Sequence, residues 1–368
     1  LVEQNWSQGH GPNHQVSPNL HMQTGGLIQE KAKDAQAGEE RVAGMDSIRF
    51  IAALWVAFYH LGFSSTFSIT ERVSLEQKIL GAAVDSLFCG PAAVIVFFVI
   101  SGFCIHFPYR NGRKELEAGT FLLRHYIRIL VPLLICIATI NMMGMTYDSV
   151  GRLVGWSIEC ELVYYTAYPL ILVLGRKAGW TKLILLSFPL ALVLVLPRNP
   201  TAMMYPSFGL LWNALLGLPC WLLGCKLAEG FKAGANSSPK TKLFWRVLVI
   251  ASGSLTFSLM LHAGVGFPWT LNFFAIIAFF WLKNELFTDK KKCFSILEWG
   301  GKWSYSFYMM HGPLSTVYNR VSGFDDHEVL SPAHWMLRLL FVFAGSYFFY
   351  LAFEKTSHHF ARRITKRR

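Results

Sequence analysis

Long, uninterrupted apolar stretches recur along this chain of 368 residues, and they constrain its fold more than any other feature. Many run for about 20 residues, which as a helix is enough to cross a hydrocarbon core of about 30 Å. In lipid every backbone polar group needs an internal partner, which leaves helix bundles and closed barrels, and continuous runs favour helices over alternating strands. Charged residues make up only 15% of the chain, whereas soluble domains carry roughly 25%. We therefore predict an all-α integral membrane bundle embedded in the lipid bilayer.

About ten membrane spans follow from these apolar runs, with boundaries good to a few residues. They are predicted over residues 48–66, 82–107, 121–143, 152–174, 182–197, 207–227, 244–262, 266–282, 303–320 and 335–354.

The net charge of +12 would suggest a nucleic-acid partner in a soluble protein, but here loop charge explains it better. With the N-terminus in the cytoplasm, 24 lysines and arginines fall on the cytoplasmic side and 6 on the other. This asymmetry fits the positive-inside rule. We expect both termini in the cytoplasm, a multi-pass protein of the cell (inner) membrane, and no nucleic-acid partner.

Three segments differ in composition. Residues 1–44 are polar, rich in Gly, Gln and His, and lack the apolar core of a secretory signal, so we expect a disordered tail. Met45 directly precedes the first apolar helix, and one hypothesis is that it is the working start. Residues 45–356 form the predicted membrane domain, and residues 357–368 a basic cytoplasmic tail.

Several kinds of site lack support in the sequence. The seven cysteines form no C-x-x-C pair and lie mostly in apolar runs, so we interpret them as small buried residues, with no metal site. We also expect no permanently bound cofactor. The nucleotide-binding P-loop, the G-x-S-x-G esterase turn and the H-E-x-x-H zinc motif do not occur.

Ionisable residues within membrane spans are costly and therefore indicate function. Arg49 and His60 are eleven residues apart, which places both on one face of the first span with a rise of about 16 Å between them. An extended thioester cofactor would need this arrangement, with a cation for its phosphates near the surface and a base at depth. The alternative is a structural histidine bonded to a carbonyl and an arginine that snorkels to the interface.

Glu161 is expected about 13 Å deep in its span, at about the depth of His60. A carboxylate can fix the tautomer of a neighbouring imidazole, so we hypothesise that Glu161 orients His60. The alternative is a structural carboxylate paired with an arginine.

Three further groups are candidates. Arg124 and Arg128 share a helical face, and guanidinium groups bind phosphate well, although ordinary interfacial anchoring is an equal alternative. His311 lies mid-span, where a lone histidine is more often structural than catalytic. Glu354 is interpreted as an ion-pair partner at a helix end.

Six motifs in order along the chain resemble those of the acyltransferase-3 family of multi-pass membrane acyltransferases. They are R-x10-H from Arg49 to His60, F-F-V-I-S-G-F over 97–103, R-H-Y-I-R-I over 124–129, W-S-I-E-C-E over 156–161 followed by Tyr164 and Tyr165, S-Y-S-F-Y-M-M-H-G-P over 304–313, and S-Y to Glu354 from Ser346. The resemblance covers nearly everything after Met45. One departure is that the first arginine of the family's R-x-x-R aligns with His125, with Arg124 beside it.

The resemblance implies transfer of an acyl group, usually acetyl, from a CoA thioester to a hydroxyl of a cell-surface or secreted glycan or of a glycosylated compound. It implies that Arg49 and His60 are essential, with acyl-CoA as co-substrate. Ser101, in the motif over 97–103, is expected to be cofactor-binding together with Arg49, Arg124 and Arg128. Additional candidates in the site are His311, Trp156 and Tyr305.

Our hypothesis is that His60, oriented by Glu161, takes the proton of the acceptor hydroxyl as it attacks the thioester. Three alternatives stay open at this point. The base could be His311, the acyl group could pass through an acyl-enzyme, or the protein could be a non-enzymatic carrier of a lipid or acyl donor.

Overall fold

A computed structural model describes residues 42–68, 74–145, 152–197, 208–232, 234, 237–287, 294–325 and 328–366. All regular elements in these ranges are helices, which confirms the all-α fold class. The described residues from Ala43 onward form one compact unit. The N-terminal tail is predicted over residues 1–44, and residues 1–41 of it lie outside the described ranges.

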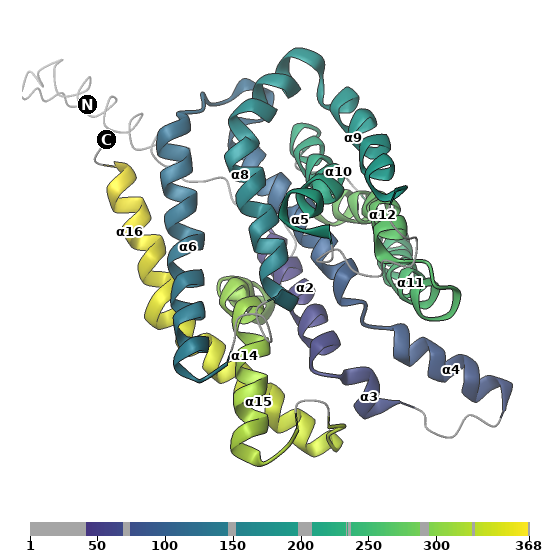
Figure 1. The fold of residues 1–368 in the computed structure, drawn as a ribbon. Coiled ribbons are helices and arrows are strands. Elements are labelled where there is room, and N and C mark those ends of the chain that lie inside the picture. Colours follow the sequence, from purple (N-terminus) through teal and green to yellow (C-terminus); the bar gives the residue numbers. More distant parts are fainter. Residues whose placement is uncertain are drawn as a thin grey trace, which may run out of the picture. The chain divides into compact units, whose positions relative to one another are not determined.

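The helices follow one another along the chain as Figure 1 shows. They are α2 (Met45–His60), α3 (Phe63–Phe67), α4 (Leu75–Ser86), α5 (Gly90–His106), the 3-10 helix η1 (Phe107–Gly112), α6 (Ala118–Met142), α8 (Arg152–Ala178), α9 (Trp180–Val195), α10 (Leu210–Glu229), α11 (Pro239–Ala263), α12 (Phe267–Leu286), α13 (Ser295–Gly301), α14 (Ser304–Ser322), α15 (Pro332–Phe349), the π-helical turn η3 (Tyr350–Glu354) and α16 (Lys355–Lys366).

Six helical segments of the described chain are long and apolar enough to cross a membrane, so the protein is multi-pass. They are Gly90–Gly112, Ala118–Met142, Gly155–Ala178, Leu210–Glu229, Pro239–Ala263 and Pro332–Ile364. Helix α9 is apolar but shorter, and the 16 residues of α2 rise only about 24 Å. The count of ten spans and the cytoplasmic position of the termini therefore stay predictions.

Two predicted spans are interrupted in the structure. The span over 48–66 breaks after His60, because Gly62 takes a left-handed conformation with φ 65° and the chain restarts as α3. The span over 82–107 divides into α4 and α5, and α5 starts afresh with Pro91 in its first turn. The first break places His60 at the C-terminal end of α2.

Helix α5 lies at the centre of the bundle and is buried along most of its length (Figure 1). Its closest neighbour is α10, because two glycines let the two backbones meet. A Cβ atom on Gly102 would lie 2.0 Å from the carbonyl oxygen of Trp221, and one on Gly224 would lie 2.0 Å from that of Val99. Small residues at such crossings are the usual means of close helix packing in membranes.

The C-terminal end of α2 is held by two side chains of α15. Trp335 Nε1 donates a hydrogen bond of 2.8 Å to the carbonyl oxygen of Leu61, and Arg338 Nη2 donates to the same oxygen. Both side chains are buried. A buried cation at a helix C-terminus is favourable because the last carbonyl groups carry partial negative charge. These contacts fix the position of His60, which directly precedes Leu61.

Replacing Arg338 with methionine is expected to lower the unfolding temperature of the purified protein in detergent. The change removes a charged donor from a buried carbonyl group, an interaction that typically contributes about 1.5–3 kcal/mol. The control is Arg320→Met, which removes an exposed arginine whose Nη1 donates 3.0 Å to Met143 O. Equal unfolding temperatures for the two variants would contradict the stabilising role of Arg338.

Candidate active site

Two histidines from helices far apart in sequence meet in the bundle. Nδ1 of His60, the last residue of α2, lies 2.9 Å from Nε2 of His311 in α14. The two imidazole rings are nearly parallel, with 12° between their planes. His311 is fully buried, whereas His60 is partly exposed. Of the pair, only His60 can therefore reach a substrate.

The hydrogen bonds of His311 determine which nitrogen of His60 is free to act. Nδ1 of His311 lies 2.7 Å from the carbonyl oxygen of Tyr308, which can only accept, so this nitrogen carries the proton. Nε2 of neutral His311 is then an acceptor, and Nδ1 of His60 must donate to it. This leaves a lone pair on Nε2 of His60, which is the state that a general base requires.

The structure gives His60 a different partner from the one that we hypothesised. His311 holds its ring, whereas Glu161 lies on α8 beside Tyr165 and Ser101. The hydroxyl of Tyr165 donates 3.5 Å to Glu161 Oε2 and lies 3.1 Å from the hydroxyl of Ser101. The charge of Arg49 acts on Glu161.

Arg49 faces the bundle interior near the N-terminal end of α2, whereas His60 is at the C-terminal end. Its Nη1 donates 3.0 Å to Asp46 Oδ1, and its Nη2 donates 2.9 Å to the sulfur of Cys104 on α5. The arginine side chain keeps 33% of its surface exposed. It can therefore still offer donors to an anionic ligand.

Ser101 links the centre of the bundle to this polar group. Its hydroxyl accepts a hydrogen bond of 3.3 Å from Nε1 of Trp221 in α10 and pairs with Tyr165 in α8. Ser101 is buried, directly before the close glycine crossing of α5 and α10. The motif over 97–103 thus places a buried polar contact and a close helix crossing at adjacent residues.

A buried carboxylate completes the cluster at the Arg49 end. Glu354, the last residue of the π-helical turn η3, accepts hydrogen bonds from the backbone N of Ser306, at 3.1 Å, and from the Ser306 hydroxyl. Nε2 of His358 lies 3.8 Å from its Oε1. The charges of both Arg128 and Arg49 act on Glu354. Single π turns within helices are frequent at functional sites.

The two arginines of α6 lie in different surroundings. Arg128 acts electrostatically on Glu354, and also on Cys104, the partner of Arg49. Arg124 acts on Tyr109, and both arginines act on His125. Arg128 therefore belongs with the Arg49 cluster, and Arg124 lies one turn away toward η1.

The remaining candidates from the sequence, Tyr305 and Trp156, make contacts between helices of the bundle. Tyr305 donates 3.2 Å to the carbonyl oxygen of Ile129, which ties α14 to α6. Trp156 is buried, with its ring edge-on to Phe98 at 5.9 Å between centroids.

Some contributors were missed by sequence reasoning. Cys104 and the carbonyl group of Tyr308 give no sequence signal, because any apolar position can supply them. Arg338 does give a signal, since it is an ionisable residue inside the predicted span 335–354.

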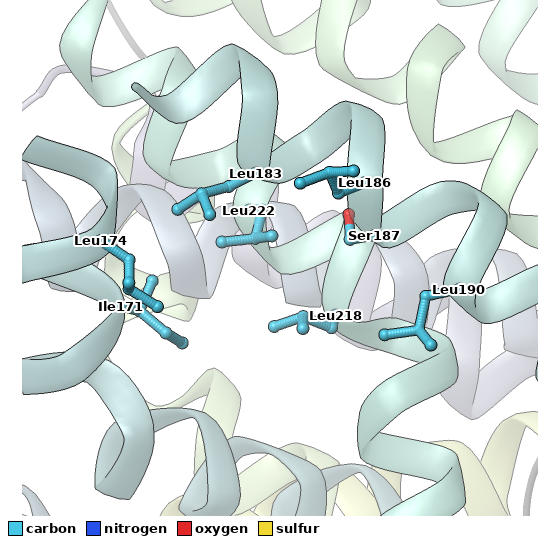
Figure 2. A pocket seen from close by; sticks show the side chains of 8 residues that line it. All are labelled: Ile171, Leu174, Leu183, Leu186, Ser187, Leu190, Leu218 and Leu222. Atoms are coloured by element: carbon cyan, nitrogen blue, oxygen red, sulfur yellow. The ribbon is translucent and has the colours of Figure 1, made fainter. Parts of the chain in front are cut away.

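An apolar hollow of about 190 Å³ lies elsewhere, between α8, α9 and α10. Seven leucine and isoleucine side chains and Ser187 line it, as Figure 2 shows. The Ser187 hydroxyl already donates 2.8 Å to the carbonyl oxygen of Ile184. This hollow holds no titratable side chain and is separate from the chemistry of the histidine pair.

Comparison with known proteins supports the family expected from the motifs. The family model Acyl_transf_3, described as an acyltransferase domain, matches residues 42–352. Searches of curated proteins and of solved structures found no match. The match includes both histidines, Arg49, Arg128 and Glu161, and it extends over most of the chain. The chain therefore belongs to the acyltransferase-3 family of membrane proteins.

Proposed function

We propose that the protein moves an acyl group, acetyl in the simplest case, from cytoplasmic acyl-CoA to a hydroxyl of a cell-surface or secreted glycan or of a glycosylated compound. The family supports acyl transfer at a membrane. The observation that carries the mechanism is the His60–His311 hydrogen bond, which leaves Nε2 of His60 as the acceptor nitrogen. We propose the cell (inner) membrane as its location.

His60 Nε2 takes the proton of the acceptor hydroxyl while the hydroxyl oxygen attacks the thioester carbonyl carbon. The carbon–sulfur bond then breaks, and the CoA thiolate takes the proton back from His60. The products are an acyl ester and CoA thiol, so atoms and charge balance. General base catalysis of this kind contributes about 10²–10⁴-fold. Positioning of donor and acceptor supplies much of the rest.

His311 acts here as a positioning residue, since it is fully buried. It accepts the Nδ1–H of His60 and so stabilises the imidazolium that forms during attack. This assigns to His311 the role that we first gave to Glu161. Glu161 stays a candidate on which the charge of Arg49 acts, and its hydrogen bond from Tyr165 links the carboxylate to Ser101.

Arg49 and Arg128 provide the donor end of the site. Planar guanidinium groups bind phosphate oxygens in pairs. The eleven residues from Arg49 to His60 rise about 16 Å along α2, a length that an extended pantetheine arm can span. The phosphates of CoA thus lie at the Arg49 end and the acyl group at the His60 end.

The test is a comparison of surface and secreted glycans from cells with and without the protein. Mass spectrometry should show a loss of one acyl group per modified sugar in cells that lack it, and wild-type protein should restore that mass. A carrier predicts transport without any covalent change. Unchanged glycan masses, together with movement of donor or lipid into vesicles, would overturn the enzymatic proposal.

A further inference from the structure

The basic helix α16 continues directly from α15 and η3 and forms the last part of the membrane-crossing segment Pro332–Ile364. The 18 residues of α15 and the 5 of η3 rise about 35 Å together, slightly more than the hydrocarbon core. Residues beyond Glu354 therefore reach the polar surface of the membrane. Helix α16 lies outside the family match, which ends at residue 352. It carries Lys355, Arg362, Arg363 and Lys366.

Helix α16 packs along α6, and this contact decides which way its basic side chains face (Figure 1). Ser357 and Ala361 are buried, one turn apart. The neighbouring pair His358 and Arg362, also one turn apart, lies beside this buried stripe. The charges of Arg128 on α6 and of Arg362 both act on His358. Two helices thus bring their basic groups together.

The buried carboxylate of Glu354 stands at the centre of this group. Both of its oxygens have contacts, Oε2 with Ser306 and Oε1 with His358 at 3.8 Å. The charges of Arg49 and Arg128 act on it as well. Arg128 and Arg362 are both exposed, so an anion can approach them.

We propose that Arg362 and His358 of α16 complete, together with Arg128, a binding site for the phosphate groups at the nucleotide end of the acyl-CoA donor. The identity of the donor rests on the proposed function. Planar guanidinium groups from two helices can each bind a pair of phosphate oxygens, which a single surface charge would not match. Helix α16, which the sequence indicates only as a basic tail, is in this proposal part of the binding site for the acyl-CoA donor.

The test uses the full chain in lipid nanodiscs and the variant Arg362→Gln. Charge-assisted hydrogen bonds are strong, so we expect CoA to bind about 10- to 100-fold more weakly to this variant. The KM for acetyl-CoA should rise to a similar degree, while kcat stays close to that of the wild type. Acetyl-pantetheine lacks the nucleotide phosphates, so its KM should not change. The measurements are equilibrium binding of CoA and steady-state acetyl transfer with both donors.

Arg363→Gln is the matched control. It removes the same charge from the same helix, at a position rotated by about 100° from Arg362. Arg363 is exposed, and binding of CoA should change by less than about twofold, as for an ordinary surface charge.

Three results would overturn the phosphate site. They are wild-type CoA binding by Arg362→Gln, an equal loss with acetyl-CoA and acetyl-pantetheine, or a defect seen only in nanodiscs of anionic lipid. The last result would assign Arg362 to lipid headgroup phosphates. If CoA binding depends on Arg362 but the wild-type protein transfers no acyl group, the proposed function fails while the phosphate site stands.

Discussion

Replacing His60 with glutamine is expected to lower kcat for acyl transfer by about 10²–10⁴-fold, the usual contribution of a general base. Binding of CoA should stay at the wild-type level, because Arg49 lies about 16 Å further along α2. The measurement is single-turnover acetyl transfer alongside equilibrium CoA binding. A loss of CoA binding equal to the loss of rate would show that His60 acts on binding and not on the chemical step.

Substitutions of His311, the partner of His60, can distinguish a positioning role of His311 from a catalytic one. His311→Leu removes the acceptor of the His60 Nδ1–H and should lower kcat about 10- to 100-fold, as expected when a hydrogen bond to a charged group is lost. His311→Gln places an amide oxygen near the former Nε2 and should recover most of that loss. If His311 is itself the base, both variants are equally inactive and His60→Gln keeps its activity.

Replacing Gly102 with alanine is expected to prevent normal packing of α5 against α10. The added methyl group would lie 2.0 Å from the Trp221 carbonyl oxygen, and backbone atoms cannot move aside as a side chain can. Overpacking in a close-packed interior costs typically 1–3 kcal/mol and occasionally more. The expected result is a lower unfolding temperature in detergent and less protein in the membrane fraction. Gly224→Ala should act in the same way from the α10 side.

The matched control for Gly102 is Gly119→Ala in α6. No heavy atom lies within 4 Å of a Cβ atom built there, and alanine is the better helix former. This variant should be as stable as the wild type or slightly more stable. Equal unfolding temperatures for the Gly102 and Gly119 variants would mean that α5 and α10 are further apart than the structure shows.

The helical membrane fold could be predicted because lipid leaves few solutions to an apolar chain. Breaks within the apolar runs were harder to place. Gly62 and Pro91 lie inside stretches that read as continuous by hydropathy, and only the local backbone geometry ends the helix there. The break after His60 matters most, since it puts this residue at a helix end that α15 secures.

The sequence could predict which residues form the site, but not which of them contact each other. Arg49 and His60 stand out because their spacing alone puts them on one helical face. Spacing gives depth within a span but does not give the neighbouring helix. His60 and His311 are 251 positions apart, and nothing in either segment indicates that α2 and α14 touch. The assignment of Glu161 to His60 therefore rested on depth, and the partner in the structure is His311.

The chain of hydrogen bonds that starts at His60 runs through His311 and stops at the backbone carbonyl oxygen of Tyr308. The Tyr308 carbonyl accepts a hydrogen bond but cannot pass a proton on, so no proton can move from the histidine pair through Tyr308. A proton on Nε2 of His60 can therefore leave only through the exposed side of that ring, to the reacting molecules or to water, and not through His311. The acyl transfer that we propose thus needs no proton relay across the bundle by way of this pair.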